Sequence, residues 1–291
     1  MTRYSVVALA AILWTAGLAA GVAHASGTPS ARAAAKDVYV LGLGDSLPFG
    51  FDVARYTTGH IDPAVDFADG FVDQTTTMLR TMRPARSISL TNYSCPGETT
   101  ASLLAGPCAY AAFGLPLHDA YAGSQMAAAE AFLAAHPGPG VILVNVGAND
   151  PGDFTPECQQ LADPNPCLLA AYPALAPEIH ARIRTNLTTI IQRLRVAAPK
   201  ARILVWNTYA LDDTDPQTAV LLHDVNGAIR EAVTRSHARA TLLDATRIVT
   251  SSTLCALTSW CEGGGDSHLT PAGHERYARR IVRALRHARL R

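Results

Sequence analysis

The sequence lacks the features expected of a protein that binds nucleic acid or a metal. Its formal net charge is +0, and Lys36 and Lys200 are its only lysines. A balanced charge gives no general attraction for nucleic acid or for an anionic membrane. None of the cysteines is spaced as C-x-x-C, and no histidine lies at a zinc-ligand distance from them. We therefore expect no nucleic-acid partner, no metal site and no thioredoxin-like redox function.

Long apolar runs are also absent, apart from one at the N-terminus. Arg3 precedes the apolar run 6–20, and Ala23-His24-Ala25 places small residues at a suitable cleavage point. This is the layout of a secretory signal peptide. A retained membrane anchor is the alternative, because the run approaches the length that spans a bilayer. The small residues favour cleavage near Ala25, so we expect a signal peptide over 1–25, a flexible lead over 26–36, and a secreted protein without stable membrane insertion.

The cysteines agree with export, because they fall into three pairs of near neighbours. Six cysteines allow many pairings, and the most economical one joins Cys95 to Cys108, Cys158 to Cys167 and Cys255 to Cys261. Disulfides form and persist in oxidising compartments. We expect three loop-closing disulfides.

Segments typical of strands and helices alternate along the rest of the chain. The apolar runs predict strands ending at Leu43 and spanning 87–91, 140–146, 202–206 and 240–243, with helices over 67–82, 120–135, 177–196 and 218–236 and a last one after Thr270-Pro271. Such alternation predicts a three-layer α/β/α sandwich with a mostly parallel sheet. We expect one domain over 37–291, in which the proline-rich segment 151–177 is a disulfide-tied insertion.

The first predicted strand ends abruptly in Gly44-Asp45-Ser46-Leu47. In parallel α/β sheets, ligands bind beyond the carboxyl ends of the strands, so a hydroxyl group at this position is well placed for chemistry. The alternative is an ordinary turn serine, since serine is common in turns. The short motif alone does not separate the two interpretations.

Polar residues follow other strands in the same way. Gly97 lies after the second strand, Asn149 and Asp150 follow the third, and a glycine-rich loop before the last helix contains Asp266 and His268. Because the carboxyl ends of parallel strands meet at one edge of a sheet, these residues and Ser46 form one candidate site.

Acyl-transfer chemistry assigns a role to each of these residues. A serine hydroxyl needs an adjacent base, for which His268 is the candidate, and the imidazole needs an acceptor such as Asp266. The oxyanion of a tetrahedral intermediate needs preorganised donors, which the backbone N–H groups of Ser46 and Gly97 and the side-chain amide of Asn149 could supply.

Together these motifs resemble a known family. Gly44-Asp45-Ser46-Leu47, Gly97, Gly147-x-Asn149-Asp150 and His268 before Leu-Thr-Pro-Ala-Gly are similar to the four sequence blocks of SGNH (GDSL-type) hydrolases. The resemblance implies a flavodoxin-like fold with a five-stranded sheet, Ser46 as nucleophile, His268 as base, and Gly97 and Asn149 in the oxyanion hole. Three local disulfides also resemble the secreted actinobacterial lipases and esterases of this family. Ser46 does not lie in the G-x-S-x-G elbow of the α/β-hydrolases, so that fold is not implied.

One position departs from the family pattern. The family usually has aspartate three residues before the histidine, where this sequence has Gly265. Asp266 lies only two residues before His268, so either the loop lets Asp266 reach the ring or another acceptor orients it. A backbone carbonyl and Glu262 are the alternatives.

The remaining candidates carry weaker signals. Gly42-x-Gly44-x-x-Leu47 lacks the third glycine and the acidic partner of a dinucleotide loop. Four isolated histidines fit a surface or core position better than a site: His60, His118, His180 and His223. Aromatic residues near strand ends could line an acyl pocket or pack in the core: Trp206, Tyr209 and Trp260. Asp150 is expected to anchor its loop.

The sequence thus predicts a secreted serine carboxylester hydrolase that acts through an acyl-enzyme on lipid or short-chain esters. It needs no cofactor, and we expect a monomer whose partner is a small-molecule or lipid ester. A carbohydrate acetyl-esterase using the same site is one alternative. A secreted binding protein that keeps the fold without turnover is another.

Overall fold

The computed structural model describes residues 37–58, 61–112, 114–161, 165–211, 216–262 and 266–287. All of them fall within one compact unit. The predicted signal peptide and flexible lead lie outside the described residues. Within these ranges, no helix combines the length and apolar character needed to cross a membrane.

A sheet of five parallel strands forms the centre of the fold. The strands are β1 (Val38–Gly44), β2 (Ile88–Asn92), β3 (Gly140–Asn145), β4 (Arg202–Trp206) and β5 (Thr241–Leu243). Their order in the sheet is β2-β1-β3-β4-β5, and every pairing is parallel. The order reverses direction between β1 and β3, which is the switch point where ligands bind in flavodoxin-like sheets. The predicted fold class is confirmed.

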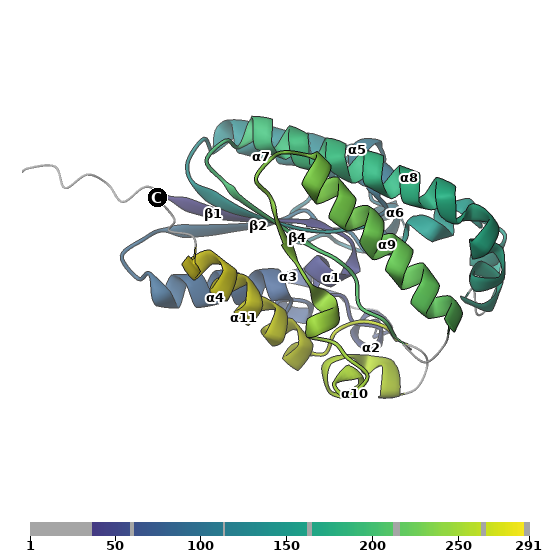
Figure 1. Ribbon diagram of the computed structural model, residues 1–291. Helices are drawn as coiled ribbons and strands as arrows, with labels where there is room; N and C mark the ends of the chain where they lie inside the picture. Colours follow the sequence, from purple (N-terminus) through teal and green to yellow (C-terminus); the bar gives the residue numbers. More distant parts are fainter. Residues whose placement is uncertain are drawn as a thin grey trace, which may run out of the picture. The chain divides into compact units, whose positions relative to one another are not determined.

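Helices cover both faces of this sheet. Figure 1 shows α7 (Gln125–Ala135), α8 (Asn165–Ala197) and α9 (Pro216–Arg235) on one face, with α4 (Phe71–Met82) and α11 (Pro271–His287) on the other. Alternate residues of β1 explain both layers. Leu41 and Leu43 pack in the core beneath the first group of helices, whereas Val38 and Val40 pack in the core beneath the second. Burial on both faces accounts for the nearly continuous apolar strands.

Short helices lie in the loops that follow the carboxyl ends of the strands. They are α1 (Ser46–Phe49), α2 (Val53–Tyr56), α3 (Pro63–Asp66), α5 (Thr100–Ala105), α6 (Ala109–Ala112) and α10 (Leu254–Leu257), with 3₁₀ helices η1 (Asp150–Phe154), η2 (Cys158–Gln160), η3 (Ala245–Arg247) and η4 (Ser259–Glu262). A third apolar cluster beside α1 contains Phe49, Phe51 and Phe67.

The main difference from the predicted elements concerns α8. The sequence predicted a helix starting at residue 177, but α8 begins at Asn165 and continues through Pro173 and Pro177. Tyr172, only 3% exposed, packs into the main core. This tertiary contact favours helix across a stretch that local proline content argues against. The first turns of α8 therefore occupy the second half of the segment 151–177, which was expected to be a disulfide-tied insertion.

Three disulfides close short loops in the structure. They join Cys95 to Cys108, Cys158 to Cys167 and Cys255 to Cys261. The second links η2 to the first turn of α8, and the third links α10 to η4.

Candidate active site

Ser46 is the first residue of α1, directly after β1. The chain turns there because Gly44 adopts a φ of +125° and approaches β3 closely. A Cβ atom on Gly44 would lie 1.8 Å from the carbonyl oxygen of Asn145, so only glycine fits. The next residue, Asp45, donates its backbone N–H to that same oxygen at 3.0 Å. The ends of β1 and β3 are thereby locked together immediately before Ser46.

Asp45 fixes the start of α1. Its carboxyl group is buried and accepts a hydrogen bond from the backbone N–H of Leu47 at 3.1 Å, as a helix cap does. Burial raises the pKa of Asp45 to about 7, and the Leu47 hydrogen bond opposes this shift only partly. Within the part of the chain that the structure describes, no hydrogen bond occupies the Ser46 backbone N–H. That donor is available to a ligand.

The loop before α11 brings Asp266 onto the ring of His268. The Asp266 Oδ1 atom lies 2.6 Å from His268 Nδ1 and also accepts the His268 backbone N–H at 3.0 Å. Burial acts to raise the pKa of Asp266, but the hydrogen bonds from His268 outweigh it and leave that pKa below its ordinary value. Asp266 is therefore a carboxylate that can hold the imidazole in one orientation. The alternative acceptor, Glu262, has an exposed side chain.

Contacts from other elements hold this loop in place. The hydroxyl group of Tyr209, which follows β4, donates to the carbonyl oxygen of Ser267 at 2.5 Å. Ser259 donates its backbone N–H to the His268 carbonyl at 3.0 Å, and the ring of Phe51 meets the His268 ring edge-on at 5.0 Å. The imidazole is thus fixed by its backbone, its Nδ1 atom and a neighbouring aromatic ring.

Asn149 is tied to the loop that contains Gly97. Its side-chain amide donates to the carbonyl oxygen of Glu98 at 3.0 Å, which uses one of its two N–H groups. Gly97 is exposed and has a φ of +75°. It does not line the cavity beside Ser46, although Asn149 does. The hydrogen bond through Glu98 places the two predicted oxyanion donors on adjoining segments.

A buried glutamine, which no sequence motif singles out, connects these segments. Gln125 accepts the Gly44 backbone N–H and donates to the Gly44 carbonyl, both at 2.8 Å. The same amide donates to the Glu98 carboxyl group at 2.6 Å. Burial raises the pKa of Glu98 to about 7. The local signal is a polar residue at the start of an alanine-rich helix.

Asp150 anchors the loop that follows β3. Its side chain does so through bonds to other elements rather than to residues of its own loop. Its buried carboxyl group accepts the backbone N–H of Thr100 at 2.8 Å and the Thr100 hydroxyl. Arg182 donates to the Asp150 carbonyl oxygen at 2.7 Å. The loop after β3 is therefore attached to the start of α5 and to α8.

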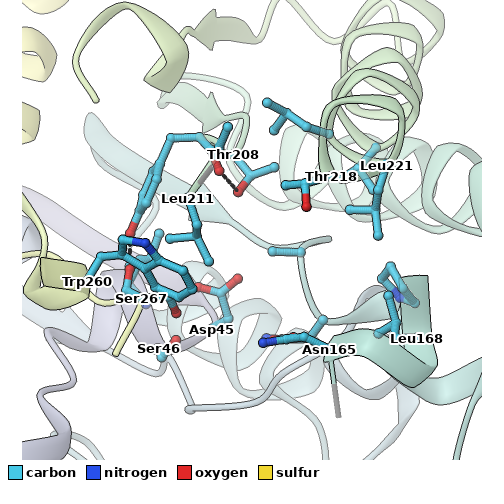
Figure 2. Close-up of a pocket in the computed structure, with 18 of the residues that line it drawn as sticks. Asp45, Ser46, Asn165, Leu168, Thr208, Leu211, Thr218, Leu221, Trp260 and Ser267 are labelled. Carbon is cyan, nitrogen blue, oxygen red and sulfur yellow. Dashed lines mark hydrogen bonds between the residues drawn. The ribbon is translucent and has the colours of Figure 1, made fainter. Parts of the chain in front are cut away.

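A cavity of about 560 Å³ opens beside Ser46, and Asn149 and His268 also line it. Figure 2 shows Asp45, Ser46, Leu211 and Trp260 toward one end of this cavity and Leu168 and Leu221 toward the other. Most of its wall is apolar and comes from α8, α9 and the segment after β4. A hydroxyl, an imidazole and an amide that line one largely apolar cavity suit acyl transfer.

The aromatic candidates lie in two different environments. Tyr209 and Trp260 line the cavity, whereas Trp206 is fully buried and packs on Tyr277 with ring centroids 4.2 Å apart.

The remaining histidines lie elsewhere in the described chain. His118 bonds the Phe49 carbonyl oxygen at 2.8 Å, His180 lies 3.5 Å from Glu231, and His223 is exposed. His60 lies outside the described residues. Within the described ranges, no group of three or more histidine, cysteine, aspartate or glutamate residues could hold a metal ion.

The sequence also matches the model of a protein family. Residues 43–276 match the model of the GDSL-like Lipase/Acylhydrolase family. The chain belongs to this family. No curated protein matches its sequence significantly.

Solved structures share the fold at low sequence identity. A lipase from a goat rumen metagenome is 14% identical, with a TM-score of 0.56 over 87% of this chain and 100% of its own. An extracellular lipase from Streptomyces rimosus is 15% identical, with a TM-score of 0.54 over 85% and 99%. An acetylxylan esterase from Geobacillus stearothermophilus is 14% identical, with a TM-score of 0.52 over 86% and 94%. At such identities the likeness concerns the fold.

Proposed function

We propose that this GDSL-family chain is an exported serine carboxylester hydrolase acting on esters with apolar acyl chains. One observation carries the proposal. Ser46 and His268 line the same cavity, and the Asp266 Oδ1 atom lies 2.6 Å from Nδ1 of the His268 imidazole. A binding protein would not require a base held in this way. The three disulfides support an oxidising, extracellular location.

In the proposed mechanism, His268 Nε2 takes the proton of the Ser46 hydroxyl as the oxygen attacks the ester carbonyl carbon. The resulting oxyanion is stabilised by the Ser46 backbone N–H, the free N–H of the Asn149 amide and the Gly97 N–H. His268 then returns the proton to the departing alcohol, leaving an acyl-enzyme. A water molecule, deprotonated by His268, attacks that acyl group and releases the carboxylic acid with Ser46 restored.

The wall of the cavity favours alkyl esters over acetylated carbohydrates. Leucine side chains from α8 and α9 contribute to it, together with Leu211 and Trp260. Each methylene group transferred from water to such a surface contributes about 0.8 kcal/mol. An acetyl group offers no such gain.

Hydrolysis of p-nitrophenyl esters of graded chain length tests the proposal, with acetylated xylan as the competing substrate. Ser46→Ala and His268→Ala should each lower kcat by about 10⁴- to 10⁶-fold while keeping the wild-type melting temperature. Undiminished hydrolysis by Ser46→Ala would contradict the mechanism. Absence of turnover by the wild type on every ester would favour a binding protein, and turnover of acetylated xylan alone would favour a carbohydrate acetyl-esterase.

A further inference from the structure

A second cavity of about 440 Å³ adjoins the one beside Ser46. The two cavities share part of their walls, to which Leu211, Leu222 and Trp260 contribute. Neither Ser46 nor His268 lines the second cavity. The second cavity therefore adjoins the first one at a part of the wall that does not include the reacting groups.

The second cavity is apolar inside and polar at its rim. Val249, which is 3% exposed, and the partly buried Leu254 form its inner wall. Thr250 and Ser251, which also line the cavity, are exposed. The second cavity is open to solvent, because exposed residues line part of it, so an apolar ligand can enter and displace water from its inner wall. Because this apolar inner wall adjoins the cavity that contains Ser46, an apolar chain is the ligand that it suits.

The wall between the cavities is held by a covalent link. Trp260 lies in η4, and the Cys255–Cys261 disulfide joins η4 to α10, which carries Leu254. Trp260 and the inner wall of the second cavity therefore lie on segments that a disulfide joins. A wall shared by both cavities can distinguish ligands by length, because a short chain fits within the first cavity whereas a long one can continue past Trp260.

We propose that the second cavity is a distal subsite for the apolar chain of a long-chain ester, reached past Leu211 and Trp260. The inference rests on the proposed esterase function and adds the substrate class. Short esters would use the first cavity alone, whereas long-chain lipid esters would occupy both. The gain from the second cavity is about fourfold in kcat/KM for each methylene group that it holds.

A bulky side chain placed at the rim of the second cavity tests the proposed subsite. Ser251→Trp introduces an indole at an exposed position that lines only the second cavity. It should lower kcat/KM for p-nitrophenyl dodecanoate and hexadecanoate by about 20-fold or more and leave the value for butanoate unchanged. Ser252→Trp is the matched control, because Ser252 is also exposed and lines neither cavity. It should leave the whole chain-length profile unchanged.

Val249→Phe fills the same space from inside and should give the same selective loss, with a melting temperature that reports folding. An equal effect on all chain lengths, or an unchanged rate for long chains in both variants, would overturn the subsite. A wild type that hydrolyses only short esters would also overturn it, while leaving the proposed function standing. Absence of hydrolysis at every length would instead contradict the proposed function.

Discussion

At the scale of single residues, the departure from the family pattern is resolved by backbone geometry. Asp266 accepts both the His268 backbone N–H and the ring Nδ1–H through one oxygen, Oδ1. A carboxylate two residues before the histidine can make both bonds because the chain turns tightly between them. The other oxygen, Oδ2, accepts the backbone N–H of Val53 at 3.4 Å, which steadies the carboxylate from α2.

The contact with His268 makes Asp266 the residue to test. Asp266→Ala should lower kcat by about 10³- to 10⁴-fold, because the imidazole loses both its orientation and the charge that stabilises its protonated form. Glu262→Ala is the matched control, since Glu262 is an exposed carboxylate on the same loop, and it should retain full activity. Steady-state hydrolysis of p-nitrophenyl butanoate measures both. A loss below about tenfold in Asp266→Ala would assign the orienting role to a backbone carbonyl.

At the scale of elements, α8 shows tertiary packing overriding local preference. Its first turns contribute Leu168 and Leu169 to the cavity wall, and the Cys158–Cys167 disulfide fixes their start. A helix that began at residue 177 would leave this wall without regular structure. The continuous helix thus determines one side of the proposed acyl site.

Pro177→Ala distinguishes a continuous helix from one that starts at this residue. Pro177 is exposed and lies inside α8, so alanine should restore a backbone hydrogen bond and raise the free energy of unfolding by about 1–3 kcal/mol. Pro271→Ala is the control, because Pro271 occupies the first position of α11, where proline is favourable. It should bring no gain. Urea unfolding measures both, and a destabilised Pro177→Ala would contradict the continuous helix.

At the scale of the whole molecule, buried ionisable groups set the pH dependence of stability. Burial raises the pKa of Asp45, Asp73 and Glu98 to about 7 and that of Asp150 to about 6. Between about pH 4 and 7 the folded state keeps protons that these groups release on unfolding. Burial also lowers the pKa of His274 to about 3, so below about pH 6.5 the unfolded chain gains one proton there. Burial lowers the pKa of His118 as well, and the four carboxyl groups outweigh these two histidines.

The free energy of unfolding should therefore rise as the pH falls from 8 to about 5. Asp73 allows a test away from the catalytic residues, because its buried Oδ2 has no hydrogen-bond partner among the described residues. Asp73→Asn should reduce the loss of stability between pH 5 and 8 by about 2–3 kcal/mol. Asp37→Asn, at an exposed aspartate, should leave the pH profile unchanged. Urea unfolding at pH 5 and pH 8 measures these free energies. A wild type that is more stable at pH 8 than at pH 5 would contradict the expectation.

The sequence by itself determined the sheet and the position of the nucleophile candidate. Apolar runs bounded by glycine and proline are local signals, so β4 was predicted with its observed limits, and Ser46 follows from the abrupt end of β1. Parallel strands bring their carboxyl ends to one edge, so convergence of the loops containing Ser46, Asn149 and His268 could also be predicted.

Only the tertiary structure decided how these residues are held. Gln125 bridges Gly44 and Glu98 through hydrogen bonds between positions far apart in the chain, and no local pattern encodes such a contact. The start of α8 depends on packing of Tyr172 in the core, which outweighs the preference of its prolines. The second cavity depends on the path of three separate segments around Trp260. Local chemistry selects the reacting groups, whereas long-range packing shapes the space in which they act.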